Sequence, residues 1–288
     1  MVKYPPIVLK ELQVILLQMV KDIDAICRKY DITYWGCFGT AIGAMRHNGF
    51  IPWDDDVDLG VMLSDYEKLK KVPECEWEAR GLFFLTGECK EKYHTCLYAK
   101  VYKKDTSFET DFRKQYFPNN EYSPIWIDVF VFNRFKTPKQ VEEKIKYALR
   151  AQKLYWASKL KAPLSLSIYR RFLYVISNLF MRAPYKFIYK RLYATICKLD
   201  SCSTGGVVSS LTVLEGGEMC RLICEEKDMF PVQYVKFEDF DMPVIKNTHQ
   251  ILNQLYSDYM QMPPEDKRIN HSPAVLDFGD GRGNVLVQ

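Results

Sequence analysis

The sequence predicts an α+β fold in which a mixed β-sheet core is flanked by helices and carries an inserted basic helical subdomain. Three observations support this prediction. Residues 7–30 repeat apolar side chains at helical spacing. The runs at 57–63 and 122–132 are rich in β-branched and aromatic residues, as buried strands are. Residues 138–198 return to helical patterns and are rich in Lys, Arg and aromatic side chains.

The composition indicates a globular chain. It has 288 residues, of which 48% are hydrophobic and 26% are charged. Its net charge of +4 is too small to indicate nucleic-acid binding from the total alone. The start has no signal-peptide pattern, and no run approaches the roughly 20 apolar residues that span a bilayer. With nine cysteines and no export signal, we expect reduced thiols in a cytoplasmic protein.

The patterns divide the chain into three parts: a core over 1–137, a basic aromatic helical subdomain over 138–200, and a segment over 201–288 that completes the core. In the core, apolar periodicity predicts helices over 7–30, 41–47 and 64–71, the last opened by a capping box at Ser64–Glu67. Strands are expected over 33–38, 82–86, 96–102 and 122–132. A strand over 234–240 and a helix from Thr248 follow.

The most informative stretch is an acidic cluster, Asp54, Asp55, Asp56 and Asp58, which lies between two apolar runs. Two charges of one sign at 4 Å repel by about 1 kcal/mol in water and by several times more in a less polar medium, so a cation is needed nearby. Asp56 and Asp58 alternate with aliphatic residues, which places both carboxylates on one face of a strand. This pattern predicts a site for Mg²⁺, the usual ion where a substrate carries phosphates.

A solvated acidic turn and a calcium loop fit the cluster less well. A solvated turn would not need apolar residues on both sides. A calcium-binding EF-hand loop that begins at Asp54 needs Gly at its sixth position and Glu at its twelfth, where this chain has Leu59 and Asp65.

A Gly-Thr pair lies shortly before the acidic cluster. Gly39 and Thr40 are expected to turn the chain from a strand into the helix over 41–47. Helix N-termini bind phosphate through their N–H groups. We therefore expect Gly39 and Thr40 to hold a nucleotide phosphate close to the carboxylates.

Two charged residues fall inside expected strands. Asp128 is the acid in the apolar run over 122–132, and a buried aspartate is costly unless it is paired or binds a metal. A hydrogen-bonded structural aspartate is the alternative. Lys100 lies in the strand over 96–102. It either contacts a nucleotide phosphate or extends its ammonium group into water from a sheet edge.

Two roles are open to the basic segment: a helical subdomain with a solvated charged face, or peripheral contact with an anionic membrane, where Lys and Arg meet headgroups and aromatic rings lie at the interface. A zinc site is an alternative for the region between residues 75 and 96. It lacks a Cys-x2-Cys pair, so we expect scattered thiols instead. The residues concerned are Cys75, Cys89, His94 and Cys96.

Motifs at both ends of the chain resemble one known family. They are Gly39-Thr40, Gly43-Ala44-x-Arg46-His47-x-Gly49-Phe50-Ile51-Pro52-Trp53-Asp54-Asp55-Asp56-Val57-Asp58, Ile127-Asp128-Val129-Phe130, Phe237-Glu238 with Pro243, and Tyr256-Ser257-Asp258-Tyr259-Met260 with Pro263-Pro264. The sequence is similar to the LicD family, which comprises bacterial phosphocholine transferases of surface polysaccharides and is related to fukutin and fukutin-related protein. The resemblance implies a nucleotidyltransferase-like core. Ser257 stands where the family usually has Gly.

The resemblance implies metal-assisted phosphoryl transfer. Asp56 and Asp58 would carry Mg²⁺, as one ion or two, with Mn²⁺ as a substitute. Asp128 would be a bridging ligand or general base, and Asp54 a further ligand or an orienting group. The donor would be CDP-choline, and phosphocholine would pass to a hydroxyl of a teichoic acid or lipopolysaccharide precursor as CMP leaves.

The resemblance also suggests residues that bind the donor phosphates. Arg46 and His47 follow the phosphate-facing helix, and Arg268 lies near the C-terminal motif. For Arg268, binding a phosphate and capping a helix are equally supported.

The implied partners are a CDP-linked donor and a lipid-linked glycan, with peripheral contact at the inner face of the plasma membrane and no nucleic acid. Three alternatives stay open. The cargo could be a polyol phosphate, such as ribitol or glycerol phosphate, from a CDP donor. The chain could instead be a non-catalytic metal- or lipid-binding module. It could also be a nucleotidyltransferase that acts on RNA.

Overall fold

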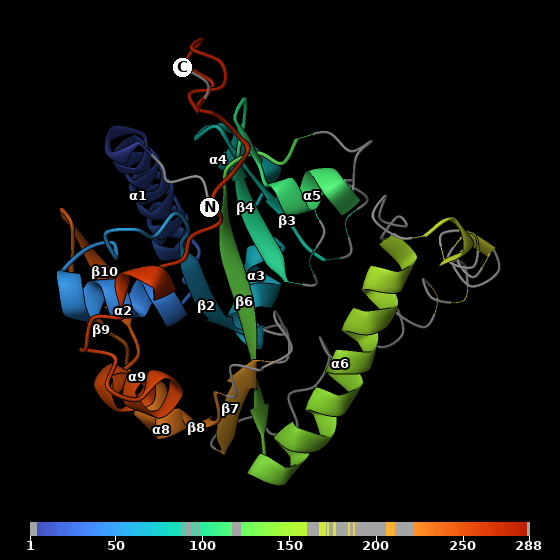
Figure 1. Ribbon diagram of the computed structural model, residues 1–288. Coiled ribbons are helices and arrows are strands. Elements are labelled where there is room, and N and C mark those ends of the chain that lie inside the picture. The colour runs from blue at the N-terminus through green and yellow to red at the C-terminus, as the bar shows by residue number, and fades with distance from the viewer. Residues whose placement is uncertain are drawn as a thin grey trace.

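The protein is a mixed α/β structure built on a seven-stranded sheet, as the computed structural model shows (Figure 1). The structure describes residues 5–87, 98–116, 122–159, 206–210 and 222–286, with isolated positions at 89, 94, 96, 167–170, 172, 175–176, 184 and 187. The central strand order is β1-β2-β6-β4-β3, and β7 pairs with both β6 and β8. The prediction of helices around a mixed sheet is confirmed, while the nucleotidyltransferase-like assignment stays a prediction.

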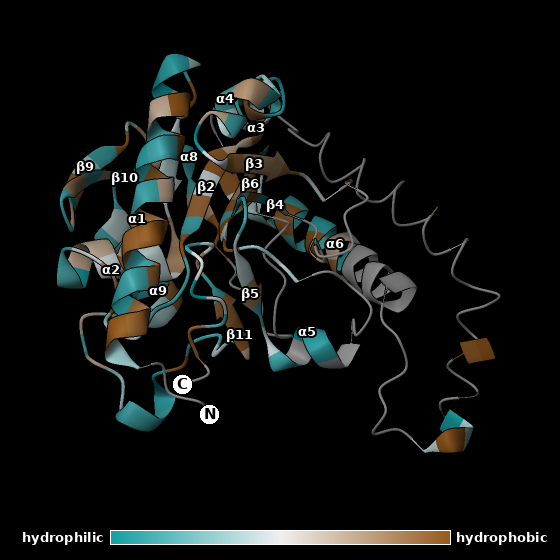
Figure 2. Cartoon of the chain, turned by 90° about the horizontal axis from the view of Figure 1, so that it is seen from above, coloured by the Kyte–Doolittle hydropathy of each residue, from teal (hydrophilic) through white to brown (hydrophobic). Residues whose placement is uncertain are grey.

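The sheet is mixed because one of its pairings, between β2 and β6, is parallel and the others are antiparallel. Figure 2 shows hydrophobic residues concentrated on its strands. The strands are β1 (Tyr34–Gly36), β2 (Asp58–Met62), β3 (Leu82–Leu85), β4 (Ala99–Lys103), β6 (Trp126–Phe135), β7 (Val207–Ser210) and β8 (Cys224–Glu225).

The long helix α1 (Pro6–Lys29) covers one face of this sheet. Its buried residues, such as Leu12 and Leu16, belong to one core cluster with Leu59 of β2 and Val129 of β6. Because side chains alternate along a strand, the next residues in sequence point to the opposite face. There Phe130 and Phe132 of β6 pack in a second cluster that includes Trp35 and Met62. The charged residues Asp58, Lys100 and Asp128 share this second face by the same alternation.

Shorter elements connect and cover the sheet. The helices are α2 (Phe38–His47), α3 (Leu63–Leu69), α4 (Glu74–Glu78), α5 (Asp111–Tyr116), α6 (Pro138–Lys159), α8 (Glu226–Met229) and α9 (Thr248–Tyr256), with a 3₁₀ turn η1 (Glu265–Lys267). Two small antiparallel sheets pair β9 (Gln233–Phe237) with β10 (Phe240–Val244), and β5 (Ser107–Glu109) with β11 (Val275–Asp277). The second pairing brings the C-terminal segment beside the core.

Several expected elements need correction. Helix α2 begins at Phe38, so Gly39 and Thr40 lie inside its first turn and do not form a preceding loop. No side-chain hydrogen bond caps α3, so the capping box expected at Ser64–Glu67 does not form. The single strand expected over 234–240 is a hairpin, because Glu238 has a positive φ of 57° and reverses the chain.

The inserted segment is described only in part. Helix α6 agrees with the start of the helical pattern expected over 138–198, and β7 and β8 after the insertion join the same sheet as β6. From residue 160 to 198 only isolated positions are described, so the basic subdomain stays a prediction. Within the residues that the structure describes, no helix is both long and apolar enough to cross a bilayer.

Candidate functional site

The register of three neighbouring strands brings three charged residues into one row. Asp58 of β2 lies opposite Asp128 of β6, and Asp128 lies opposite Lys100 of β4. Side chains of residues that are opposite each other on paired strands point to the same face. The two aspartates that the sequence placed 70 residues apart are therefore neighbours across the sheet.

Lys100 forms a buried ion pair with Asp128. The Nζ–Oδ1 distance is 2.7 Å, and the side chains are 11% and 9% exposed. The ammonium group also lies 4.1 Å from the centre of the Trp126 ring, a cation–π contact. Strand β4 lies between β3 and β6 and is not an edge strand. The alternative in which Lys100 extends into water from a sheet edge is therefore wrong. Its contact with a nucleotide phosphate stays a prediction.

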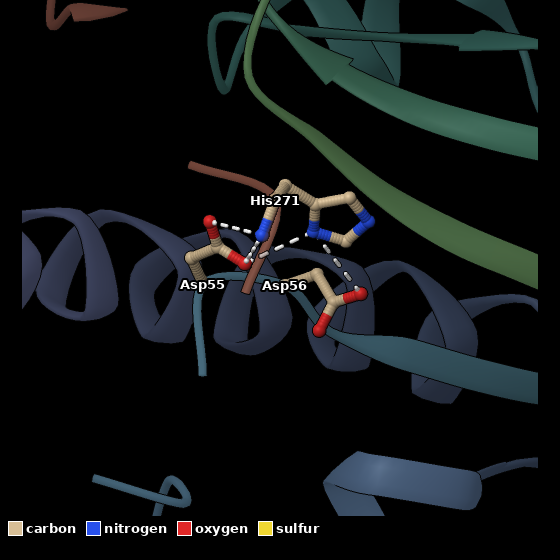
Figure 3. A group of neighbouring side chains, drawn as sticks. All are labelled: Asp55, Asp56 and His271. Carbon is tan, nitrogen blue, oxygen red and sulfur yellow. Dashed lines mark hydrogen bonds and ion pairs between the residues drawn. The ribbon is translucent and has the colours of Figure 1, made fainter. Parts of the chain in front are cut away.

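The acidic loop is joined to the C-terminal segment by His271 (Figure 3). The backbone N–H of His271 donates to both carboxylate oxygens of Asp55, at 3.0 and 3.1 Å. Its ring Nδ1 lies 2.9 Å from Asp55 Oδ1 and 3.8 Å from Asp56 Oδ2. The Asp55 side chain is fully buried, whereas that of Asp56 is 23% exposed.

The carboxylates are close enough to change each other's ionisation. Burial and the neighbouring Asp56 and Asp55 raise the pKa of Asp54 well above its ordinary value. Burial and the charges of Asp56, Asp128 and Asp54 raise the pKa of Asp58 in the same way. Loss of hydration and repulsion between like charges both disfavour the ionised form. A cation among these oxygens would remove that repulsion.

His271 is the positive partner of the cluster. Burial alone would lower the pKa of its imidazole, but the hydrogen bond to Asp55 and the charges of Asp56 and Asp128 outweigh burial and raise the pKa to about 10. The ring therefore carries a positive charge at neutral pH and offsets part of the acidic charge.

The first turn of α2 lies against the acidic residues. The hydroxyl oxygen of Thr40 accepts a hydrogen bond from the backbone N–H of Asp58 at 2.8 Å, and the N–H of Cys37 donates to the Asp58 carbonyl at 3.0 Å. A Cβ atom placed on Gly39 would lie only 3.2 Å from Asp54 Oδ2. Gly39 therefore permits a close approach, which puts a helix N-terminus next to the carboxylates.

The loop that carries the aspartates is held from two other sides. Gln13 of α1 donates from Nε2 to the carbonyl of Asp54 at 3.0 Å. A Cβ atom on Gly43 would meet the carbonyl oxygen of Gly49 at 2.5 Å, so the chain that leads to the aspartates crosses α2 in direct contact with its backbone.

This donor set fits a hard divalent cation. Asp54, Asp56, Asp58 and Asp128 supply only oxygen ligands, which are the type that Mg²⁺ prefers. The charges of Asp54, Asp56 and Asp128 act on Asp58, so the four carboxylates are neighbours, while their role as metal ligands stays a prediction. Within the described residues, the group whose ligand atoms all lie within 4.8 Å of one another is a different one, Asp55, Asp56 and His271. Cys75, Cys89, His94 and Cys96 form no such group in the described part of the chain.

Two other predicted residues lie away from the carboxylates. Arg46 and His47 end α2, whereas Gly39 and Thr40 begin it. The Arg46 guanidinium donates to the backbone carbonyls of Tyr259 and Gln261 at 2.6 and 3.3 Å, so it ties α2 to the C-terminal segment. These contacts do not support a role in phosphate binding, which stays a prediction.

Arg268 stays close to the acidic loop. Its guanidinium lies 4.9 Å from the centre of the Trp53 ring, and Trp53 directly precedes Asp54. Its Nε donates to the carbonyl of Pro263 at 3.1 Å, and Arg268 follows η1 directly. Because Pro263 precedes η1, this contact is not a cap at the end of a helix, and both roles stay predictions.

Asp55 and His271 are functional candidates that the sequence did not single out. Asp55 is one of four acids close together, and nothing in the local pattern distinguishes it from Asp54 and Asp56. His271 lies 216 positions away, a pairing that no local pattern announces.

Comparisons with known proteins agree with the motifs. A family model described as LicD/FKTN/FKRP, nucleotidyltransferase domain, matches residues 31–169. The chain is 28% identical over 276 residues to the lipopolysaccharide cholinephosphotransferase LicD of Haemophilus influenzae. This alignment covers 91% of this chain and 95% of that protein. It is 39% identical over 61 residues to the ribitol 5-phosphate transferase FKRP of human and mouse, which covers 21% of this chain and 12% of FKRP.

Proposed function

The chain belongs to the LicD family, and we propose that it is a phosphotransferase that moves phosphocholine from CDP-choline to a hydroxyl of a cell-surface glycan, with release of CMP. Its named relatives are transferases of phosphate-linked groups, which supports a glycan phosphate-transferase role. The similarity to the cholinephosphotransferase runs along nearly the whole chain, which favours choline as the cargo. The acceptor proposed is a teichoic acid or lipopolysaccharide precursor.

One observation carries the proposal: Asp58 and Asp128 meet across β2 and β6 and share a cluster with Asp54 and Asp56. Asp56, Asp58 and Asp128 would hold Mg²⁺, as one ion or two, with Mn²⁺ as a substitute. Asp54 would be a further ligand or would orient one. When bound, the metal would neutralise the donor diphosphate and lower the pKa of the acceptor hydroxyl.

The protein groups around the cluster have separate tasks in this proposal. Lys100 fixes the orientation of the Asp128 carboxylate, which would be a bridging ligand or the general base for the acceptor hydroxyl. Gly39 and Thr40 place the N-terminus of α2 beside Asp54, where its N–H groups would attract a donor phosphate. Positioning of the two substrates then supplies most of the rate enhancement.

A second cargo is supported by one comparison. The short but closer match to ribitol 5-phosphate transferases favours transfer of ribitol phosphate, or glycerol phosphate, from a CDP donor. Such a donor offers hydroxyl groups where choline offers a quaternary ammonium group. The choline would need an aromatic surface, since quaternary ammonium ions bind over ring faces.

The acceptor would be lipid-linked, and the protein would meet it at the inner face of the plasma membrane. Exposed apolar residues in the insertion support this part of the proposal. At helical spacing, Ile168, Tyr169, Phe172, Val175 and Ile176 fall on one face and are 86%, 71%, 60%, 53% and 39% exposed. The sequence from 161 to 198 adds eight basic residues and no acidic one: Lys161, Arg170, Arg171, Arg182, Lys186, Lys190, Arg191 and Lys198. Basic and apolar groups together favour an anionic bilayer surface.

The decisive experiment incubates the purified protein with Mg²⁺, a choline-free glycan preparation and, in parallel, CDP-choline, CDP-ribitol or CDP-glycerol. We expect CMP release to be fastest with CDP-choline, with phosphocholine recovered on the glycan. Faster CMP release from CDP-ribitol or CDP-glycerol would mean that the transferred group is a polyol phosphate, while the proposed reaction type would stand. Metal binding without turnover of any donor would make the chain a non-catalytic module. Tight, strongly salt-dependent RNA binding without such turnover would favour an RNA nucleotidyltransferase.

A further inference from the structure

We propose that His271 is a substrate-contacting residue of the transfer site, which meets a phosphate oxygen of the CDP donor through Nε2, and that Asp55 is the positioning residue that orients its ring. This inference rests on the proposed function and extends it to two residues outside the metal-binding set. It also divides the acidic cluster into carboxylates that face the donor and one that holds a histidine.

The contacts of Asp55 are those of an anchor. Its side chain is fully buried, and both of its oxygens accept the backbone N–H of His271 at 3.0 and 3.1 Å. Oδ1 also lies 2.9 Å from the ring Nδ1. Asp56 also faces this ring nitrogen, at 3.8 Å, but its side chain is 23% exposed. A carboxylate with its oxygens directed at one residue is suited to orient that residue.

The imidazole ring is held on its other sides by aromatic residues. The rings of Phe108 and Trp126 meet it nearly edge-on, with centroids 6.3 and 6.2 Å away and interplanar angles of 78° and 73°. Phe108 lies on β5, and β5 pairs with β11, the strand that follows His271 in the sequence. The ring orientation is therefore fixed by three neighbours before any ligand binds, as a preorganised site requires.

The second ring nitrogen remains available. Figure 3 shows Nε2 on the side of the ring opposite to Asp55. No hydrogen bond joins it to any residue that the structure describes, and the side chain is 40% exposed. The ring also lies within electrostatic reach of Asp54 and Asp58. A donor diphosphate held beside these carboxylates would come within reach of Nε2, and a ring nitrogen that carries a proton donates well to phosphate oxygens.

The test separates the two ring nitrogens by substitution. In His271→Asn, the side-chain amide can still donate toward Asp55, but nothing remains at the position of Nε2. We expect the kcat/KM for CDP-choline to fall about 10-fold to 100-fold, the usual effect of losing a hydrogen bond to a charged group. Titration calorimetry with CDP in the presence of Mn²⁺ should show weaker CDP binding, while Mn²⁺ alone binds as in the wild type.

Asp55→Asn and the double variant test positioning. If Asp55 acts through His271, the double variant should lose little more activity than His271→Asn alone. His249→Asn is the matched control, since His249 is also hydrogen-bonded, to Tyr259 at 2.8 Å, but stands outside the acidic cluster. Its activity and CDP affinity should equal those of the wild type.

The outcomes are distinguishable. Wild-type CDP affinity and activity in His271→Asn would overturn the inference and leave the proposed function intact. Loss of Mn²⁺ binding in that variant would make His271 a metal ligand with Asp55 and Asp56, which also overturns it. A wild-type protein that releases CMP from no CDP donor would overturn the proposed function together with this inference.

Discussion

Asp58 and Asp128 lie directly opposite each other on β2 and β6, the parallel pair of strands in the sheet. A slip of one residue in this register would turn one of the carboxylates to the face that α1 covers. The apolar residues that alternate with them, Leu59 and Val129, are 1% and 2% exposed in the main core, which fixes the register. Core packing on one face thus determines the geometry of the acidic cluster on the other.

Removing a carboxylate from this pair should abolish transfer without unfolding the protein. In Asp58→Asn or Asp56→Ala, the metal would lose a ligand worth several kcal/mol of transition-state stabilisation, so we expect CMP release to fall about 100-fold to 1000-fold or more. Asp65→Asn is the control, because Asp65 pairs with Lys68 in α3 outside the cluster. Normal activity in the Asp56 or Asp58 variant would refute the metal assignment.

The melting temperature of Asp58→Asn should respond to Mg²⁺ less than that of the wild type. Burial and the neighbouring acids already oppose the ionised form of Asp58, so the melting temperature of Asp58→Asn without metal should equal or exceed that of the wild type. Added Mg²⁺ should raise the melting temperature of the wild type and much less that of the variant. Equal shifts, measured by scanning calorimetry, would place the ion elsewhere.

Replacing Lys100 should destabilise the fold. Lys100→Met leaves the Asp128 carboxylate in a buried position without its 2.7 Å ion-pair partner, and breaking a buried pair costs about 3–5 kcal/mol. Urea unfolding should detect this loss, and Mg²⁺ should restore part of it by supplying positive charge. Lys104→Met, which breaks an exposed pair with Glu78, should change the free energy of unfolding little. A stable Lys100→Met protein would show that Asp128 does not depend on Lys100.

A methyl group on Gly43 should displace the loop that leads to the aspartates. The added Cβ would meet the carbonyl oxygen of Gly49 at 2.5 Å, and neither backbone can move without shifting α2 or the loop. We expect Gly43→Ala to lower the free energy of unfolding by about 1–3 kcal/mol, as overpacking does, and to reduce CMP release more than its stability loss explains. Unchanged activity and unfolding would show that the loop adapts at no cost.

The apolar face in the insertion should mediate membrane contact. Phe172→Glu with Ile176→Glu places two acids among exposed apolar side chains and basic residues, so sedimentation with anionic phosphatidylglycerol vesicles should fall about tenfold or more. Phosphatidylcholine vesicles should bind the wild type more weakly. Val14→Glu, a change at an exposed apolar residue of α1, is the control. Equal sedimentation of all three proteins would place the membrane contact elsewhere.

The local sequence determined the long first helix, the strand that carries Asp58 and the motif of the acidic cluster. Helical periodicity predicted α1, and the alternation predicted a strand that carries Asp58, although β2 begins at Asp58 and Asp56 precedes it. These predictions succeeded because apolar spacing and strand alternation depend only on neighbours in sequence. The motif at residues 39–58 also indicated the LicD family, whose nucleotidyltransferase-domain model matches residues 31–169.

Only the tertiary structure decided what lies beside those residues. The pairing of Lys100 with Asp128 depends on which strands are adjacent, and the contact of His271 with Asp55 joins residues 216 positions apart. The start of α2 at Phe38 likewise depends on hydrogen bonds to Asp58 that reach across the fold. Partners distant in sequence are selected by core packing and strand register, which no local pattern encodes.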